Sequence, residues 1–156
     1  MAIDYAWLES TVLKRKLKEG ERSELGRLLI EKSVAKKTNI LTQGQVGGVL
    51  YILRSGMAEI TADSNGQQVH LGGAREGDLF GELTFLTGDV ATATVVAEND
   101  CIVYKLKRDD CSKLMQSEPD LVYAFVAYML ANATKIIRSK DADHVNMMQF
   151  IGSSHK

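Results

Sequence analysis

Residues 77–95 read GDLFGELTFLTGDVATATV, from Gly77 to Val95, and this stretch decides how the chain is interpreted. The order of residues predicts a glycine-rich loop, a single helical turn and then a strand. Gly81 has no side chain, so another group can approach the backbone closely at that point. The turn that follows presents free N–H groups, which favour an anion.

Glu82 places a carboxylate directly beside these N–H groups. A carboxylate suits a ligand that carries both a phosphate and hydroxyls, because it accepts hydrogen bonds from a ribose. In the alternative interpretation, Glu82 only stabilises the start of the helical turn through the helix dipole. Both interpretations remain open on the residues alone.

Around this stretch, residues 34–107 read as a series of short strands. An apolar run from Leu50 to Leu53 lies between glycines, and Asn65-Gly66 predicts a tight hairpin turn. Residues 92–97 and 101–106 predict two further strands around a polar turn. Many short strands with glycine turns are typical of a sandwich or barrel, so we expect a mainly β fold with flanking helices.

Helical patterns flank the β-rich segment on both sides. Residues 1–33 have leucines at helical spacing, and Gly20 is expected to divide that segment into two helices. Residues 108–140 predict a short hinge helix, with Asp110 as its N-cap and Ser117 near its end, and a long helix that begins at Pro119. Residues 141–156 form a tail, either a helical extension that docks on the domain or on a partner, or a frayed end.

The long helix is apolar nearly all round its circumference, with Leu121, Val122, Phe125 and Val126 on different faces. Such a helix must be covered on nearly all sides. We therefore expect a homodimer formed by residues 120–138 of two chains, with twofold symmetry. The alternative is a monomer in which the N-terminal helices cover the outer face.

Composition narrows the remaining functional classes. The formal net charge of −1 over 156 residues gives no overall attraction to nucleic acid or to an anionic membrane. The two cysteines, Cys101 and Cys111, form no metal-binding pair and are expected to be reduced thiols. We find no signal peptide, membrane span or catalytic motif, and too short a remainder after the long helix for a DNA-binding domain. The expectation is a cytoplasmic, non-enzymatic protein without metal or cofactor.

The stretch from Gly77 to Val95 closely resembles the phosphate-binding cassette of cyclic-nucleotide-binding domains, which reads roughly Phe-Gly-Glu-Leu-Ala-Leu, a variable loop, then Arg-Ala-Ala-Thr-Val. The segment Leu50-Tyr51-Ile52-Leu53-Arg54-Ser55-Gly56 resembles the family's strand and turn. Gly44 resembles its early turn glycine, and Asp109-Asp110 followed by Leu114 resembles the start of its hinge helix. The resemblance implies a double-stranded β-helix, a jelly-roll-like β-roll with N-terminal helices and a long C-terminal helix.

The same resemblance implies a ligand site. It assigns Glu82 to the ribose 2′-hydroxyl, and it places the pocket lining on Gly81, Glu82, Leu83, Ala91, Thr92 and Ala93. Contacts to the base, or a lid over it, would come from Asn132, Ser139 and Lys140 on the long helix. The implied ligand is cAMP or cGMP.

The cassette departs from the family at one decisive position, because Ala91 stands where the arginine is expected. No Arg or Lys occurs between Glu76 and Lys105. An arginine normally answers the cyclic phosphate with a bidentate charged pair. We therefore expect a regulatory sensor with weak or altered nucleotide binding. The alternatives are a sensor of another small molecule and a ligand-free module for dimerisation or protein docking, acting through an unknown output partner.

Overall fold

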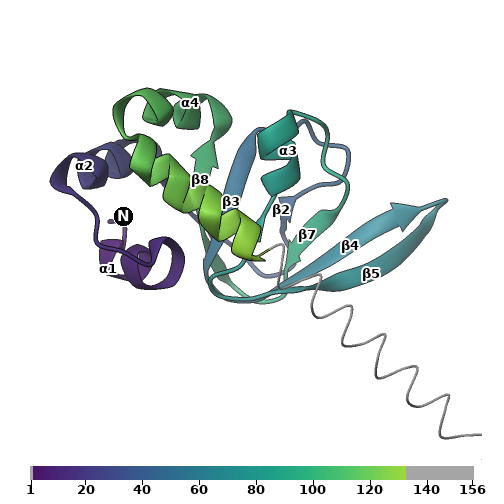
Figure 1. Ribbon diagram of the computed structural model, residues 1–156. Coiled ribbons are helices and arrows are strands. Elements are labelled where there is room, and N and C mark those ends of the chain that lie inside the picture. The colour runs from purple at the N-terminus through teal and green to yellow at the C-terminus, as the bar shows by residue number, and fades with distance from the viewer. Residues whose placement is uncertain (1, 133–156) are drawn as a thin grey trace, which may run out of the picture.

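The computed structural model describes residues 2–132, and every structural statement below refers to this part of the chain. Two four-stranded antiparallel sheets form a roll, and the helices other than the short one at residues 82–87 gather on one side of it (Figure 1). The strand order is β1-β8-β3-β6 in one sheet and β2-β7-β4-β5 in the other. This architecture confirms the expected β-roll with flanking helices.

The N-terminal elements are α1 (Tyr5–Trp7), the π-helical stretch η1 (Leu8–Leu13) and α2 (Glu19–Leu28). The strands are β1 (Ile30–Val34), β2 (Asn39–Leu41), β3 (Val49–Ser55), β4 (Ala58–Ser64), β5 (Gln67–Ala74), β6 (Leu79–Phe80), β7 (Thr94–Ala97) and β8 (Cys101–Lys107). The short helix α3 (Glu82–Thr87) interrupts the strands, α4 (Arg108–Ser117) follows them, and residues 119–132 form the last described helix.

The continuous apolar run in β3 is explained by burial on both faces of its sheet. Alternate side chains of a strand point to opposite faces. Leu50 and Ile52 accordingly pack with the helices, whereas Tyr51 and Leu53 face the interior of the roll. All four residues are at most 5% exposed, so both faces of this strand are covered.

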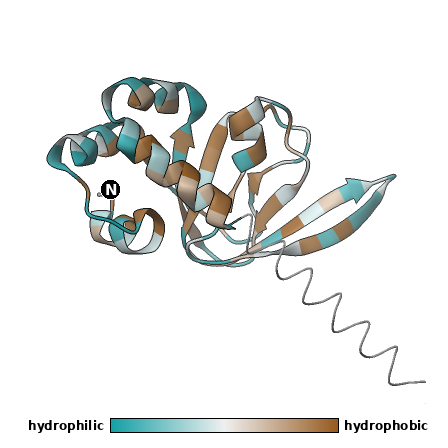
Figure 2. Ribbon diagram, viewed as in Figure 1, coloured by the Kyte–Doolittle hydropathy of each residue, from teal (hydrophilic) through white to brown (hydrophobic). Residues whose placement is uncertain are grey.

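The hairpin between β4 and β5 forms as expected from Asn65-Gly66. The two residues adopt φ values of 53° and 80°, which is the left-handed geometry of a tight two-residue turn. The hairpin projects beyond the roll in Figure 1, and apolar and polar residues alternate along it in Figure 2.

Three local expectations at the helical ends were wrong. The segment expected to be helical through residue 33 turns into strand β1 at Ile30, because that strand pairs along its whole length with β8. Gly20 lies inside α2, and the first helical stretch ends instead at Lys14, whose φ is 56°. Asp110 lies in the first turn of α4, whose N-cap is Lys107; there its charge still favours the helix N-terminus.

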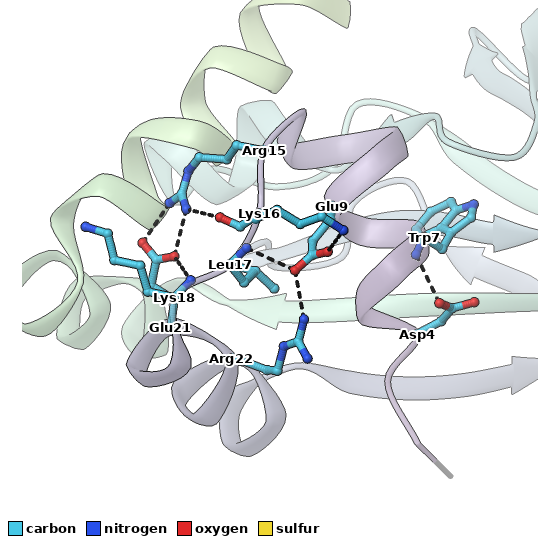
Figure 3. A network of polar contacts seen from close by, with 9 residues as sticks. All are labelled: Asp4, Trp7, Glu9, Arg15, Lys16, Leu17, Lys18, Glu21 and Arg22. Atoms are coloured by element: carbon cyan, nitrogen blue, oxygen red, sulfur yellow. Dashed lines mark hydrogen bonds and ion pairs between the residues drawn. The ribbon is translucent and has the colours of Figure 1, made fainter.

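The segment between η1 and α2 is held by two buried carboxylates rather than by helical hydrogen bonds (Figure 3). Glu9, only 5% exposed, accepts hydrogen bonds from the Leu17 amide at 3.0 Å, Lys16 Nζ at 3.0 Å and Arg22 Nη2 at 2.9 Å. Fully buried Glu21 receives two bonds from Arg15, each of 2.7 Å, and one from the Lys18 amide at 2.9 Å. Side-chain acceptors thus take over the N–H groups that a continuous helix would satisfy.

This network predicts a specific loss of stability in acid. The Leu17 amide, Lys16 and Arg22 lower the pKa of Glu9 from 4.5 to about 2. A carboxyl with a depressed pKa in the folded state stabilises fully above its unfolded pKa and loses that contribution as the pH falls from 4.5 towards 2. We expect Glu9→Gln to be less stable than wild type at pH 7, with a difference that shrinks below pH 4.5 in thermal unfolding. Glu98→Gln, an exposed loop control, should show no such trend.

The last described helix buries one side and exposes the other. Leu121, Phe125 and Met129 pack into the helix-side core, whereas Tyr123 is 75% exposed and Val126 is 37% exposed. The expected homodimer stays a prediction, and residues 133–138 of its interface lie outside the described residues. The tail, residues 141–156, lies outside them as well.

Both cysteines are free thiols; Cys101 is buried and Cys111 is half-buried. Among residues 2–132, no group of three or more His, Cys, Asp or Glu side chains could hold a metal ion. Within the same range, no helix has the length and apolar character needed to cross a membrane.

Candidate ligand-binding site

The candidate site is built on the sharp turn between β6 and α3. Gly81 adopts a φ of 77°, and a Cβ added there would lie 2.8 Å from the backbone oxygen of Val49. Only glycine combines this left-handed conformation with so close an approach to a neighbouring strand. The turn therefore depends on Gly81, and it sets the direction of α3.

The first turn of α3 leaves backbone donors free. The amides of Glu82 and Leu83 have no acceptor among residues 2–132, because a helix cannot satisfy its own first N–H groups. Leu83 is 57% exposed, so this turn faces the outside of the roll. These donors can therefore meet an external acceptor.

The Glu82 carboxylate is also without a partner. It is half-buried, yet it forms no hydrogen bond or ion pair with any described residue. The interpretation in which Glu82 only favours the helix start through its charge remains compatible with its place in the first turn of α3. In addition, the carboxylate is available to accept hydrogen bonds from a ligand.

Ala91 lies on the other side of the cassette, where its backbone is tightly held. Its amide donates to the Gln45 carbonyl and its carbonyl accepts from the Gly44 amide, both at 2.8 Å. Its side chain is 2% exposed and packs with the interior residues of the roll. Thr92 is exposed and Ala93 is half-buried beside it. The position that the resemblance assigns to an arginine is thus firmly placed but carries no charge.

The long helix reaches the first residue of the cassette. The Tyr128 hydroxyl donates to the Gly77 carbonyl, and burial raises the pKa of Tyr128. Asn132 lies beside the Tyr128 hydroxyl, where it acts against the rise in the Tyr128 pKa. It therefore belongs to the contact between the long helix and the start of the cassette. Ser139 and Lys140 lie outside the described residues.

One cation that the sequence did not suggest lies against the cassette. An added Cβ at Gly88, the C-cap of α3, would be 2.6 Å from Nη1 of Arg108. Arg108 follows strand β8, and only the packing of that strand brings it to α3. No local motif could have indicated the contact, because 19 intervening residues separate Arg108 from Gly88 in the chain.

A family model described as "Cyclic nucleotide-binding domain" matches residues 31–118, which is more than half of the chain. The chain belongs to this family. The match includes the cassette turn, the free Glu82 and the Ala91 position described above.

Curated family relatives are protein kinases and their regulatory subunits. The cAMP-dependent protein kinase regulatory subunit of Aspergillus niger is 32% identical over 117 residues, which are 75% of this chain and 28% of that protein. A cGMP-dependent protein kinase of Toxoplasma gondii is 22% identical over 142 residues, 91% of this chain and 14% of the kinase. This domain therefore spans less than a third of the length of either relative.

Solved structures of family members share the fold. A cyclic nucleotide-binding domain from Methylobacillus flagellatus superposes with a TM-score of 0.78 at 20% identity, covering 92% of this chain and 83% of that one. The regulatory domain of Toxoplasma gondii protein kinase A, solved with cAMP, gives 0.62 at 27% identity over 78% and 48%. The regulatory subunit of a cAMP-independent protein kinase A from Trypanosoma cruzi, bound to guanosine, gives 0.59 at 26% identity over 77% and 47%.

Proposed function

We propose that this cyclic nucleotide-binding domain is a non-enzymatic regulatory module that binds a nucleoside better than it binds a cyclic nucleotide. The observation that carries the proposal is the contrast between two sides of one cassette. Glu82 keeps a free carboxylate for ribose hydroxyls, whereas Ala91 provides no cation for a phosphate.

The missing charge at position 91 weakens binding of the phosphate group and leaves the ribose contacts unaffected. A cyclic phosphate carries one negative charge, and losing one partner of a charged pair costs about 2–5 kcal/mol, a factor of tens to thousands in affinity. The free amides of α3 recover only a fraction of this binding free energy, since a helix end contributes about 0.3–1 kcal/mol. A neutral nucleoside avoids the deficit but keeps its ribose contacts to Glu82. The guanosine-bound relative from Trypanosoma cruzi supports a nucleoside as ligand on this fold.

The deciding experiment is a calorimetric titration with guanosine, adenosine, cAMP and cGMP. We expect at least one nucleoside to bind more tightly than its cyclic nucleotide. Micromolar binding of cAMP or cGMP with weaker binding of both nucleosides would contradict the proposal. Absence of binding by all four would favour the module for dimerisation or protein docking instead.

If Glu82 binds the ribose 2′-hydroxyl, removing the carboxylate and removing the hydroxyl should lower nucleoside affinity by a similar factor. A hydrogen bond to a charged group contributes about 1.5–3 kcal/mol, so Glu82→Ala should lower nucleoside affinity about 10- to 150-fold. A 2′-deoxynucleoside should lose a similar factor with the wild-type protein. Because both changes remove the same bond, the variant should not distinguish ribose from deoxyribose. If Glu82→Ala and the 2′-deoxy ligand each lower affinity and their factors multiply when combined, Glu82 does not bind the 2′-hydroxyl.

The exposed face of helix 119–132 supports a second role, in assembly. Tyr123 and Val126 expose apolar surface on a helix whose opposite side is already buried. We therefore propose a homodimer through this helix, and an output signal passed to another protein rather than to DNA or to a membrane. Sedimentation at micromolar concentration should show a dimer that Tyr123→Lys and Val126→Lys together convert to monomer. Sedimentation of the wild-type protein only as a monomer would contradict the homodimer proposal.

A further inference from the structure

An apolar hollow, separate from the candidate nucleoside site, lies between α3, the β8–α4 junction and helix 119–132. Its volume is about 290 Å³, close to the lower end of small-molecule sites. Neither Glu82 nor Ala91 lines it. Its walls are mostly apolar and include Phe85, Leu86, Leu106, Met115, Phe125 and Met129.

Arg108 is the one charged residue in this lining. Its guanidinium forms no hydrogen bond or ion pair with any of residues 2–132, and its Nη1 reaches the Gly88 end of α3. The partial negative charge at a helix C-terminus attracts it only weakly. Ser112, which also lines the hollow, donates its hydroxyl to the Arg108 carbonyl and so fixes the backbone there.

We propose that this hollow binds a medium-chain fatty acid. The apolar walls would take the hydrocarbon chain, and Arg108 at the rim would take the carboxylate as a bidentate pair. An apolar pocket with one convergent charged group is the usual form of a site for such an amphipathic ligand. A nucleotide does not fit this chemistry, because its sugar and base would face apolar walls without hydrogen-bond partners.

Because of where the hollow lies, a bound ligand would affect how α3 and the long helix are arranged. Phe85 and Leu86 belong to α3 of the cassette, whereas Phe125 and Met129 belong to the long helix. A bound chain would contact both elements and favour the arrangement in which they enclose it. The fatty acid is therefore a second input to the module, independent of the contacts that Glu82 makes.

The test is a titration of the full chain, labelled with ¹³C at the methionine methyl groups, with octanoate and with octanol. Met115 and Met129 line the hollow, and Met57 does not, so Met57 serves as an internal control. Octanoate should shift the Met115 and Met129 signals with saturation and leave Met57 unchanged. Arg108→Gln should weaken octanoate about tenfold or more and leave octanol unchanged. Lys36→Gln, which removes an exposed charge outside the hollow, should alter neither titration.

Three results would overturn the proposal: no saturable shift of Met129, equal affinity for octanoate and octanol, or an unchanged octanoate affinity in Arg108→Gln. In the second case the hollow is a nonspecific apolar surface, which a second copy or another protein would cover. Glu82→Ala separates this proposal from the nucleoside site. It should lower nucleoside affinity about 10- to 150-fold and leave the octanoate titration unchanged, so that either proposal can fail without the other.

Discussion

We expect Ala91→Arg to raise the affinity of this domain for cAMP and cGMP by between tens and about a thousandfold. The added guanidinium would supply the cation that the cassette lacks. The backbone at this position is already held by hydrogen bonds to Gln45 and Gly44, so the new side chain starts from a fixed point. Calorimetry with the four ligands used for the wild-type protein measures the change.

The matched control is Ala91→Gln, which adds similar bulk without charge. Because Ala91 is 2% exposed, both variants should lose stability, and thermal unfolding of each measures that cost. A gain confined to the arginine variant and to the cyclic nucleotides, with nucleosides unaffected, would support the electrostatic account. If arginine and glutamine variants bind cAMP alike, the missing charge does not limit affinity.

Gly81→Ala should be among the most destabilising single changes in the cassette. The residue would have to hold a φ of 77°, which costs about 1–2 kcal/mol for a side chain. Its Cβ would also lie 2.8 Å from the Val49 oxygen, which belongs to a buried strand and cannot move cheaply. Overpacking of this kind adds about 1–3 kcal/mol. We expect a loss of about 2–5 kcal/mol in unfolding free energy, measured by denaturant titration, together with lost nucleoside binding.

Gly88→Ala offers a close control at the opposite end of the same helix. Its φ of 79° imposes the same backbone strain, but the atom in the way is the end of the flexible Arg108 side chain. This variant should therefore lose only about 1–2 kcal/mol. A Gly81→Ala variant no less stable than Gly88→Ala would show that the turn before α3 can relax.

The hairpin and the central strand could be predicted from residues close together in the chain. Asn65-Gly66 determines its own turn because both residues accept positive φ without help from the rest of the fold. The cassette was recognisable for a similar reason, since its glycine, carboxylate and small residues follow one another directly. The family assignment therefore rested on local patterns.

The helical ends were predicted less well, because long-range pairing decides them. Residues 30–34 form a strand only because β8, about 70 residues later, provides the partner. The end of the first helical stretch depends on Glu9, which accepts a bond from the later Leu17 amide, and on Glu21, which accepts one from the preceding Lys18 amide.

The amino-acid sequence alone indicated a cassette-like stretch that contains Glu82 and has alanine at position 91, because these are properties of consecutive residues. Only the tertiary structure decided that the Glu82 carboxylate has no internal partner, and that Ala91 is buried. It also decided that Arg108 lies beside α3 at the rim of an apolar hollow. These facts depend on the packing of β8 and helix 119–132 against the cassette, and the chain brings those elements together only when it folds.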